Sequence, residues 1–285
     1  MDQKSFVKIK KITLKAMYSD DDLMETLVLK GGNAIDLIYG VSSRSSLDLD
    51  FSMQSDFQDI AVSERKIKQA LDKSFNEEGY QIIDFKFKKK PHVCGEDKMK
   101  FWGGYSIDFK VIDKQIFIDN QSNISKLRML ASDIDSKHKK IFTIDISKYE
   151  YCIGKKTSFV DGLKIYLYSP EMIIFEKIRA ICQQTKEYLK IMEAQLPTPR
   201  AHDFFDIYTL IKKLKINTKS LDVGILKSIF EIKKVPFELI NKIEDSREFH
   251  RLGFDQVKDT LKPGEELHDF DFYFDFVVDF IQEIT

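Results

Sequence analysis

Apolar and polar positions follow two different periods along this chain. Up to about residue 168, several segments alternate between apolar and polar residues, which is the pattern of half-buried strands. These predicted strands lie at 47–53, 80–88, 104–113, 140–146 and 162–168, and helices are expected around them at 5–17, 21–26, 60–75 and about 122–134. The first half of the chain is therefore predicted to be a sheet with helices packed around it.

Helical periodicity dominates after Ser169. Ser169 is a suitable N-cap, Pro170 fits the first helical position and Glu171 falls in the first turn, so a long helix is predicted over 170–195. A proline-rich break separates it from a second helix at 201–214. Further helices are expected at 222–233, 237–246, 254–261 and 268–283. We therefore predict an α+β protein with two domains, residues 1–160 and residues 161–285.

Composition narrows the classes of function. The 285 residues include 43% hydrophobic and 32% charged residues, which argues against disorder, and the net charge of −1 excludes a uniformly basic nucleic-acid binder. The three cysteines have no paired spacing, which disfavours a disulfide scaffold and suits the reducing cytoplasm. No signal peptide and no membrane span are expected, because no apolar run approaches 18 residues.

Two aspartates stand two positions apart in a predicted strand. Asp48 and Asp50 project from the same face of that strand, with Leu47, Leu49 and Phe51 on the other. Two carboxylates so close repel each other unless a cation neutralises them, and hard oxygen ligands suit Mg²⁺. The alternative is a half-exposed strand with two solvated aspartates.

The residues before this pair add candidates for phosphate binding. Gly31 and Gly32 open a predicted helix that stops at Gly40, and the N-terminus of a helix presents N–H groups to anions. Arg44 and Ser46 supply a guanidinium and a hydroxyl that can hold a triphosphate. Taken alone, Gly-Gly is more simply an ordinary turn.

The segment LKGGNAIDLIYGVSSRSSLDLDF (29–51) resembles the nucleotidyltransferase AbiEii/AbiGii toxin family. The signature of that family is a Gly-Gly pair, a helix and an Arg-x-Ser-x-Asp-x-Asp-aromatic strand. In the wider nucleotidyltransferase signature, serine often stands at the position of Gly32, and the insert before the aspartates is shorter.

A second block, EKIRAI followed by RAHDFFDIYTL, resembles the next signature of the same family, so the resemblance covers roughly residues 25–215. The matching positions are Lys177, Arg200, Asp203 and Asp206. Asp203 and Asp206 share one helix face, where a lysine from the neighbouring helix can pair with Asp203 while it reaches a phosphate. The alternative is a buried interhelical salt bridge.

Nucleotidyltransferases usually need a third carboxylate on an adjacent strand. Asp145 and Asp108 are both candidates. The acidic strand of the family tends to lie shortly before the segment that leads into the Glu-Lys helix, which favours Asp145.

The resemblance implies a nucleotidyltransferase-like mixed-sheet domain (1–160) and a helical domain (161–285) that closes the nucleotide cleft. It implies transfer of a nucleoside monophosphate from an NTP to an acceptor hydroxyl, with a tRNA 3′ end as the expected acceptor. Asp48, Asp50 and Asp145 would hold two Mg²⁺ ions; Gly31, Gly32, Arg44, Ser46 and Lys177 would bind phosphates; Asp203 would orient Lys177.

The expected role is the toxin of a toxin–antitoxin or phage-defence pair, with a cognate antitoxin as partner. Two alternative hypotheses remain open. In the first, the acceptor is a hydroxyl of a small molecule or a protein. In the second, the chain is a catalytically silent module that binds nucleotide or RNA.

Two charged segments have both a functional and a structural interpretation. The lysines at 86–90, with those at 137–140, can form a track for an RNA backbone, but lysines also protect an edge strand from pairing. Asp271, Asp275 and Asp279 recur at intervals of four, which is typical of the outer face of a helix or of a docking face for a basic partner.

Overall fold

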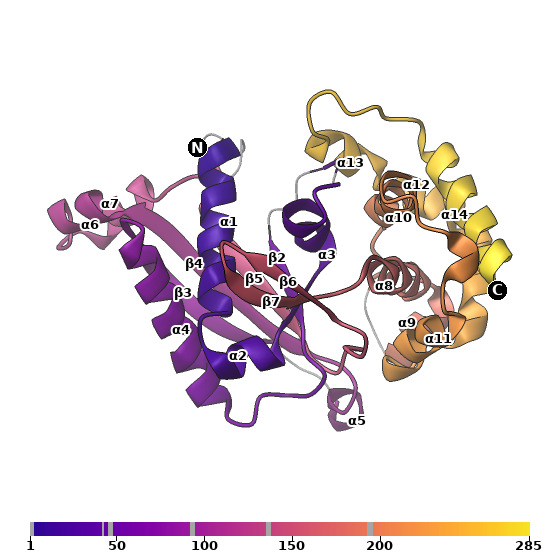
Figure 1. Cartoon of the computed structure of the whole chain (residues 1–285), viewed down its shortest axis with the longest axis horizontal. Coiled ribbons are helices and arrows are strands. Elements are labelled where there is room, and N and C mark those ends of the chain that lie inside the picture. Colours follow the sequence, from indigo (N-terminus) through magenta and orange to yellow (C-terminus); the bar gives the residue numbers. More distant parts are fainter. Residues whose placement is uncertain (1–2, 42, 45–47, 92–94, 135–137, 193–195) are drawn as a thin grey trace. The chain divides into compact units, whose positions relative to one another are not determined.

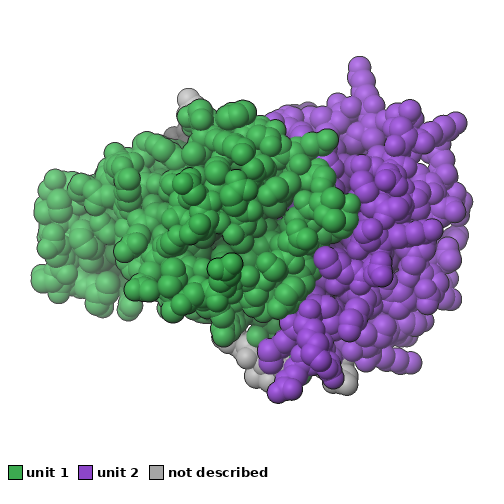
Figure 2. Space-filling model, turned by 60° about the horizontal axis from the view of Figure 1, so that its bottom comes forward, with its two compact units in different colours: residues 1–29, 47–95, 103–167 green, residues 30–46, 96–102, 168–285 purple. Residues whose placement is uncertain are grey.

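The computed structural model describes residues 3–41, 43–44, 48–91, 95–134, 138–192 and 196–285. The chain forms two compact units, which Figure 2 shows in different colours. The sheet unit comprises Met1–Leu29, Leu47–Gly95 and Gly103–Leu167, and the helical unit comprises Lys30–Ser46, Glu96–Trp102 and Tyr168–Thr285. Each unit is thus built from three stretches of chain, whereas the predicted domains divide it once, at residue 160.

One seven-stranded mixed sheet forms the centre of the sheet unit (Figure 1). Its strands are β1 (Val28–Lys30), β2 (Leu49–Ser52), β3 (Tyr80–Lys90), β4 (Gly104–Asp113), β5 (Phe142–Ser147), β6 (Lys156–Val160) and β7 (Leu163–Leu167). Their spatial order is β3-β4-β5-β2-β1-β7-β6. β1 is parallel to β7 and β2 to β5, while the β3–β4, β4–β5 and β6–β7 pairs are antiparallel. This arrangement confirms the α+β class.

The pattern of alternation located most of these strands. The five predicted alternating segments correspond to β2, β3, β4, β5 and β7. It did not predict β6, because this strand lies at the edge of the sheet and most of its residues are exposed. An edge strand without a buried face has no regular alternation of apolar and polar residues, so its sequence does not reveal it.

One face of the sheet is apolar and is covered by α1 (Gln3–Met17) and α4 (Ile60–Glu77) (Figure 1). Phe109 of β4 and Phe142 of β5 are register partners on this face and lie 5.4 Å apart between ring centroids. Phe6 of α1 packs on Phe142, and Phe75 of α4 packs on Phe109. The remaining helices of the unit are α2 (Asp21–Thr26), α6 (Lys114–Asp119) and α7 (Ile124–Leu130).

The helical unit contains the remaining described helices. They are α3 (Gly31–Asn33), α5 (Glu96–Met99), α8 (Pro170–Cys182), α9 (Lys186–Met192), α10 (Ala201–Lys213), α11 (Val223–Ile232), α12 (Arg247–Arg251), α13 (Phe254–Thr260) and α14 (Phe270–Ile284). The region 237–246, predicted as one helix, instead forms two short 3₁₀ turns, Phe237–Lys242 and Glu244–Ser246.

The prediction of one continuous helix over 170–195 was wrong. Ser169 caps α8 through Met172 N–H, as expected, but the helix ends at Cys182. Thr185 donates from Oγ1 to the carbonyl of Cys182 and accepts from Tyr188 N–H, so one side chain ends α8 and begins α9. A threonine that bonds to its neighbouring backbone competes in this way with helix continuation.

The acidic face of α14 has partners within its own unit. Arg247 and Arg251 of α12 both bind Asp271, and Arg247 also binds Asp275. Phe274 of α14 packs against Phe204 of α10 at 5.1 Å. The predicted outer acidic face is confirmed, and α12 supplies the basic groups that two of its aspartates bind.

None of the helices in the described part of the chain is long and apolar enough to cross a membrane.

Candidate active site

The polar face of the sheet carries the three predicted carboxylates. Asp50 of β2 and Asp145 of β5 are register partners on adjacent parallel strands, so their side chains leave the same face about 5 Å apart at the backbone. Asp48 stands two residues before Asp50, in a bend immediately before β2. Leu49 and Ile144, on the opposite side, are fully buried. The register thus places two of the three proposed carboxylates, those of Asp50 and Asp145, on neighbouring strands.

Lysine ammonium groups neutralise two of these carboxylates. Lys90 Nζ lies 2.7 Å from Asp145 Oδ1, and Lys139 Nζ lies 3.3 Å from Asp48 Oδ1. All four side chains are at least one-third exposed, so water screens these pairs and each contributes little to stability.

The carboxylate oxygens do not converge on a common point. Within the described ranges, no three Asp, Glu, His or Cys side chains are close enough to hold a metal ion. The donor chemistry nevertheless fits divalent cations, because all three residues supply hard carboxylate oxygens and two of them are register partners on adjacent strands. Asp48, Asp50 and Asp145 are the groups that would hold them.

Asp108 lies on the same face but one strand further away. It pairs in register with Thr143 of β5, not with Asp145. Lys88 donates to it at 2.7 Å and Thr143 Oγ1 at 3.2 Å. Asp108 therefore has a separate set of partners, whereas Asp145 is the direct neighbour of Asp50.

The lysine-rich segment 86–90 belongs to β3, which is the edge strand of the sheet next to β4. Lys88 and Lys90 reach across to Asp108 and Asp145 on the polar face. Both interpretations of this cluster therefore remain: it can protect an edge strand from pairing, and it can form part of a track for an RNA backbone.

The predicted phosphate-binding segment belongs to the helical unit. Gly31 has a φ of +68°, a backbone conformation that strains residues with a Cβ, so glycine is required there. A helical stretch continues from α3 as a π-helix over Ala34–Ile38 and ends before Gly40, whose φ is +66°. Ser46, the other predicted ligand of this segment, lies outside the described residues.

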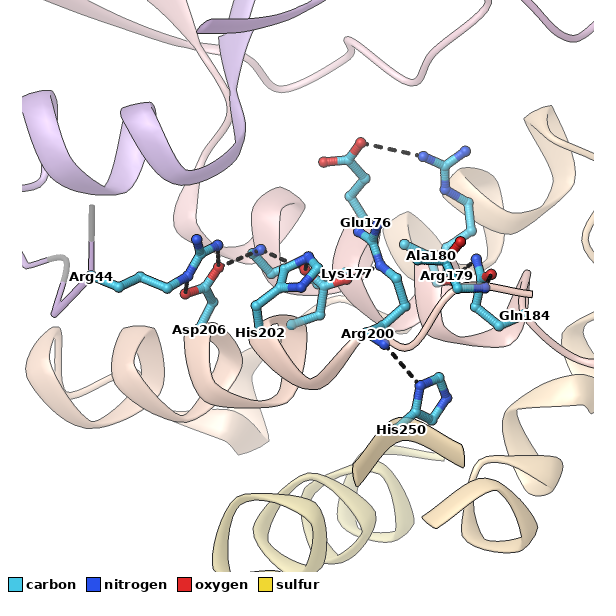
Figure 3. Close-up of polar contacts among 12 residues, drawn as sticks. Arg44, Glu176, Lys177, Arg179, Ala180, Gln184, Arg200, His202, Asp206 and His250 are labelled. Atoms are coloured by element: carbon cyan, nitrogen blue, oxygen red, sulfur yellow. Dashed lines mark hydrogen bonds and ion pairs between the residues drawn. The ribbon is translucent and has the colours of Figure 1, made fainter. Parts of the chain in front are cut away.

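Arg44 and the second signature block form a chain of buried charges (Figure 3). Arg44 binds Asp206 with two parallel hydrogen bonds of 2.7 and 2.6 Å. Lys177 donates to Asp206 at 2.7 Å and to Asp203 at 2.8 Å, and Arg200 donates to Asp203 at 2.6 Å. The predicted pairing of Lys177 with Asp203 is present, together with a second bond to Asp206. The arrangement also has the geometry of the alternative, a buried interhelical ion-pair network.

Opposite charges keep Lys177, Asp203 and Asp206 ionised. Burial raises the pKa of both aspartates, but Arg200 and Lys177 outweigh it and hold the pKa of Asp203 far below its ordinary range. For Asp206, Arg44 and Lys177 outweigh burial and lower the pKa to about 2. Burial lowers the pKa of Lys177, yet the two carboxylates more than compensate and raise it.

Two histidines next to the chain of charges are held neutral. Asp203 raises the pKa of His202, but burial and neighbouring cations led by Arg200 outweigh it and lower the pKa to about 4. Burial lowers the pKa of His250 to about 4 as well, and its Nδ1 accepts a hydrogen bond from Arg200 N–H. Neutral imidazole is the form that can accept this bond.

Sequence reasoning overlooked Lys30. Its side chain is only 9% exposed and its ammonium lies 2.5 Å from Glu176 Oε1, beside the Lys177 position on α8. The available signal was a lysine between an apolar strand and Gly31, a place where a buried cation needs a partner.

The family comparison assigns the chain to a class of enzyme, the nucleotidyltransferases. Residues 12–276 match the family described as "Nucleotidyl transferase AbiEii toxin, Type IV TA system". The chain belongs to this family, so it is a nucleotidyltransferase of a type IV toxin–antitoxin family, with an NTP substrate and an antitoxin partner. The predicted resemblance is confirmed.

Solved structures with a similar fold come from a bacterium and a fungus. A protein described as "putative nucleotidyltransferase from H. pylori" is 16% identical, with a TM-score of 0.48 over 100% of this chain and 96% of that one. JHP933 from Helicobacter pylori has the same identity and TM-score and is covered over 93% of its length. An antigenic nucleotidyltransferase-like protein from Paracoccidioides brasiliensis is 16% identical, with a TM-score of 0.39 over 84% of this chain and 90% of that one. No curated protein matches the chain.

Proposed function

We propose that this protein transfers a nucleoside monophosphate from an NTP to the 3′ hydroxyl of a tRNA, with Mg²⁺ as cofactor, and that this activity makes it the toxin of a phage-defence pair. The observation that carries the proposal is the register of Asp50 and Asp145 on adjacent parallel strands, with Asp48 two residues before Asp50. Three carboxylates on one exposed face match the ligand chemistry of two Mg²⁺ ions.

In the proposed reaction, the acceptor oxygen forms a bond to the α-phosphorus while the bond from that phosphorus to the bridging oxygen of pyrophosphate breaks. The hydroxyl proton passes to solvent and pyrophosphate leaves. Two divalent cations would supply Lewis-acid charge to the attacking oxygen and to the triphosphate. Asp48, Asp50 and Asp145 would hold these cations in place.

The helical unit would contribute groups that bind the triphosphate. Gly31 and Gly32 allow close approach of a phosphate to the backbone, and Arg44 presents a guanidinium. A guanidinium has five N–H donors, so the two bonds from Arg44 to Asp206 are compatible with a phosphate contact. Asp203 and Asp206 orient Lys177, the remaining proposed phosphate ligand.

The test is incubation with each labelled NTP, Mg²⁺ and total RNA, followed by separation of RNA, protein and small molecules. We expect label in tRNA and release of pyrophosphate. Asp50→Asn should abolish both, whereas Asp72→Asn, a matched change on α4 of the same unit, should retain them. The label would then be mapped by sequencing of tRNA ends.

Each of the other possible outcomes would support a different function for this protein. Label only in protein or in a small molecule would refute the tRNA acceptor and leave the transferase activity intact. NTP binding without pyrophosphate release, whatever acceptor is offered, would identify a silent binding module.

A further inference from the structure

The segment that follows α13 is attached to the segment that carries Arg44. Leu261 forms an antiparallel β-bridge with Arg44, and Lys262 N–H donates to the carbonyl of Ser43 at 2.9 Å. Ser43 Oγ donates to Glu265 Oε2 at 2.8 Å. We call Lys262 and Glu265, with these contacts, the Arg44 clamp.

Each clamp residue is fixed in turn by a second charged group. Lys262 Nζ lies 2.5 Å from Asp36 Oδ1, in the helical turn before Gly40. Lys213 of α10 binds both carboxylate oxygens of Glu265, at 2.7 and 2.8 Å. This lysine is the first cause of the lowered pKa of Glu265, so the carboxylate stays ionised and remains an acceptor for the Ser43 hydroxyl.

Helix α10 therefore holds the Arg44 segment at two points. Asp206 binds the Arg44 side chain directly, and Lys213 acts on the preceding residue, Ser43, through Glu265. Asp206 and Lys213 are seven residues apart, which places them on one helix face, about 10 Å apart along the axis. One rigid helix thus fixes both the backbone and the guanidinium of the segment.

We propose that Lys262 and Glu265 are positioning residues for nucleotide binding: they hold the backbone at Ser43 so that the Arg44 guanidinium meets the triphosphate. This inference rests on the proposed role of Arg44 as a phosphate ligand. Neither clamp residue touches the phosphate itself. A guanidinium contact depends on geometry to within a fraction of an ångström, so loosening its backbone weakens it without removing it.

The test compares Lys262→Met and Glu265→Gln with matched neighbours, Lys258→Met and Glu266→Gln. Binding of a non-hydrolysable NTP analogue is measured by calorimetry, and KM and kcat are measured with the NTP. We expect each clamp variant to raise the Kd and the KM about tenfold, with kcat within about twofold, since positioning partners typically act at this scale. The two control variants should bind as the wild type does.

Two further variants separate the outcomes. Lys262→Arg retains the charge that binds Asp36 and should restore most of the affinity, which a general loss of packing would not allow. Arg44→Ala measures how much affinity is lost when the guanidinium contact is removed completely. If Arg44→Ala weakens binding but both clamp variants bind like the wild type, the positioning role is wrong and the proposed function stands. If Arg44→Ala leaves the Kd unchanged, Arg44 is not a phosphate ligand and the positioning role is wrong, whereas the transfer reaction itself is tested by Asp50→Asn.

Discussion

Asp145 and Asp108 are chemically identical side chains on one sheet face that have different partners. They lie on neighbouring antiparallel strands, yet only Asp145 is the register partner of Asp50. Asp108 is paired with Thr143 and Lys88. Proximity to Asp50 and Asp48 is what a shared cation requires, so the third carboxylate of the proposed site is Asp145.

Asp145→Asn should lower kcat/KM at least about 100-fold, because it removes a charged ligand whose contribution to the transition state is several kcal/mol. Asp108→Asn, on the same face and of the same size, should cost less than about tenfold. Initial rates of pyrophosphate release at several Mg²⁺ concentrations would measure both. Equal losses of kcat/KM for the two variants, or a larger loss for Asp108→Asn, would contradict the assignment of Asp145 as the third carboxylate.

At the scale of elements, the pairing of β4 with β5 determines which residues of β4 lie next to Asp145. Gly104 begins β4 opposite Ser147 of β5. A Cβ added to Gly104 would lie 2.0 Å from the carbonyl oxygen of Ile146, which is a clash with backbone that no rotamer change can relieve. The close approach of these two strands therefore depends on glycine at this position.

Gly104→Ala should destabilise the protein by about 1–3 kcal/mol, the usual cost of overpacking, since the two strands must move apart. The free energy of unfolding in urea measures the loss. Gly95→Ala is the matched control, because a Cβ there meets nothing within 4 Å. If the two substitutions cost the same, the strand contact is not the cause.

At the scale of the whole molecule, each compact unit is assembled from distant parts of the chain. The helical unit takes in residues 30–46 and 96–102 besides the C-terminal region. In this unit the buried charges of Lys177, Asp203 and Asp206 lie beside the neutral histidines His202 and His250. The lowered pKa values of the two aspartates and the two histidines all make this unit less stable at low pH, whereas the raised pKa of Lys177 acts at high pH.

The sign follows from the lowered pKa values. His250 has a pKa of about 4 in the folded state against 6.5 as its ordinary value, so its contribution is complete above pH 6.5 and is lost as the pH falls towards 4. Asp206, with a pKa of about 2 against 3.8, adds a further loss below pH 3.8. The histidine accounts for on the order of 3 kcal/mol over its window.

We expect the Tm to fall steadily as the pH is lowered from 7 to 4.5. His250→Asn keeps an acceptor for the Arg200 N–H and removes the titration, so its Tm should change less over the same range, although it loses the contact with Phe204. Calorimetric scans at a series of pH values provide the measurement. An unchanged slope in His250→Asn would assign the pH dependence to other groups.

The sequence by itself determined the class of fold, most of the strands and the identity of the acidic face. The alternation of apolar and polar residues predicted β2, β4 and β5, because each strand has one buried face. The spacing of Asp48 and Asp50 predicted that both side chains leave one side of a strand. The helix N-cap at Ser169 could also be predicted, because an N-cap side chain bonds to a backbone N–H only a few residues further along the chain. The motifs were sufficient to identify the family.

Tertiary structure alone decided what depends on distant residues. The register that pairs Asp145 with Asp50, the assignment of residues 30–46 to the helical unit, and the clamp on Ser43 by Lys262 and Glu265 all join positions far apart in the chain. Hydrophobic periodicity reports the burial of a residue but not its partner. Ion pairs such as Lys30 with Glu176 leave no local pattern, because they are selected by the space that folding creates.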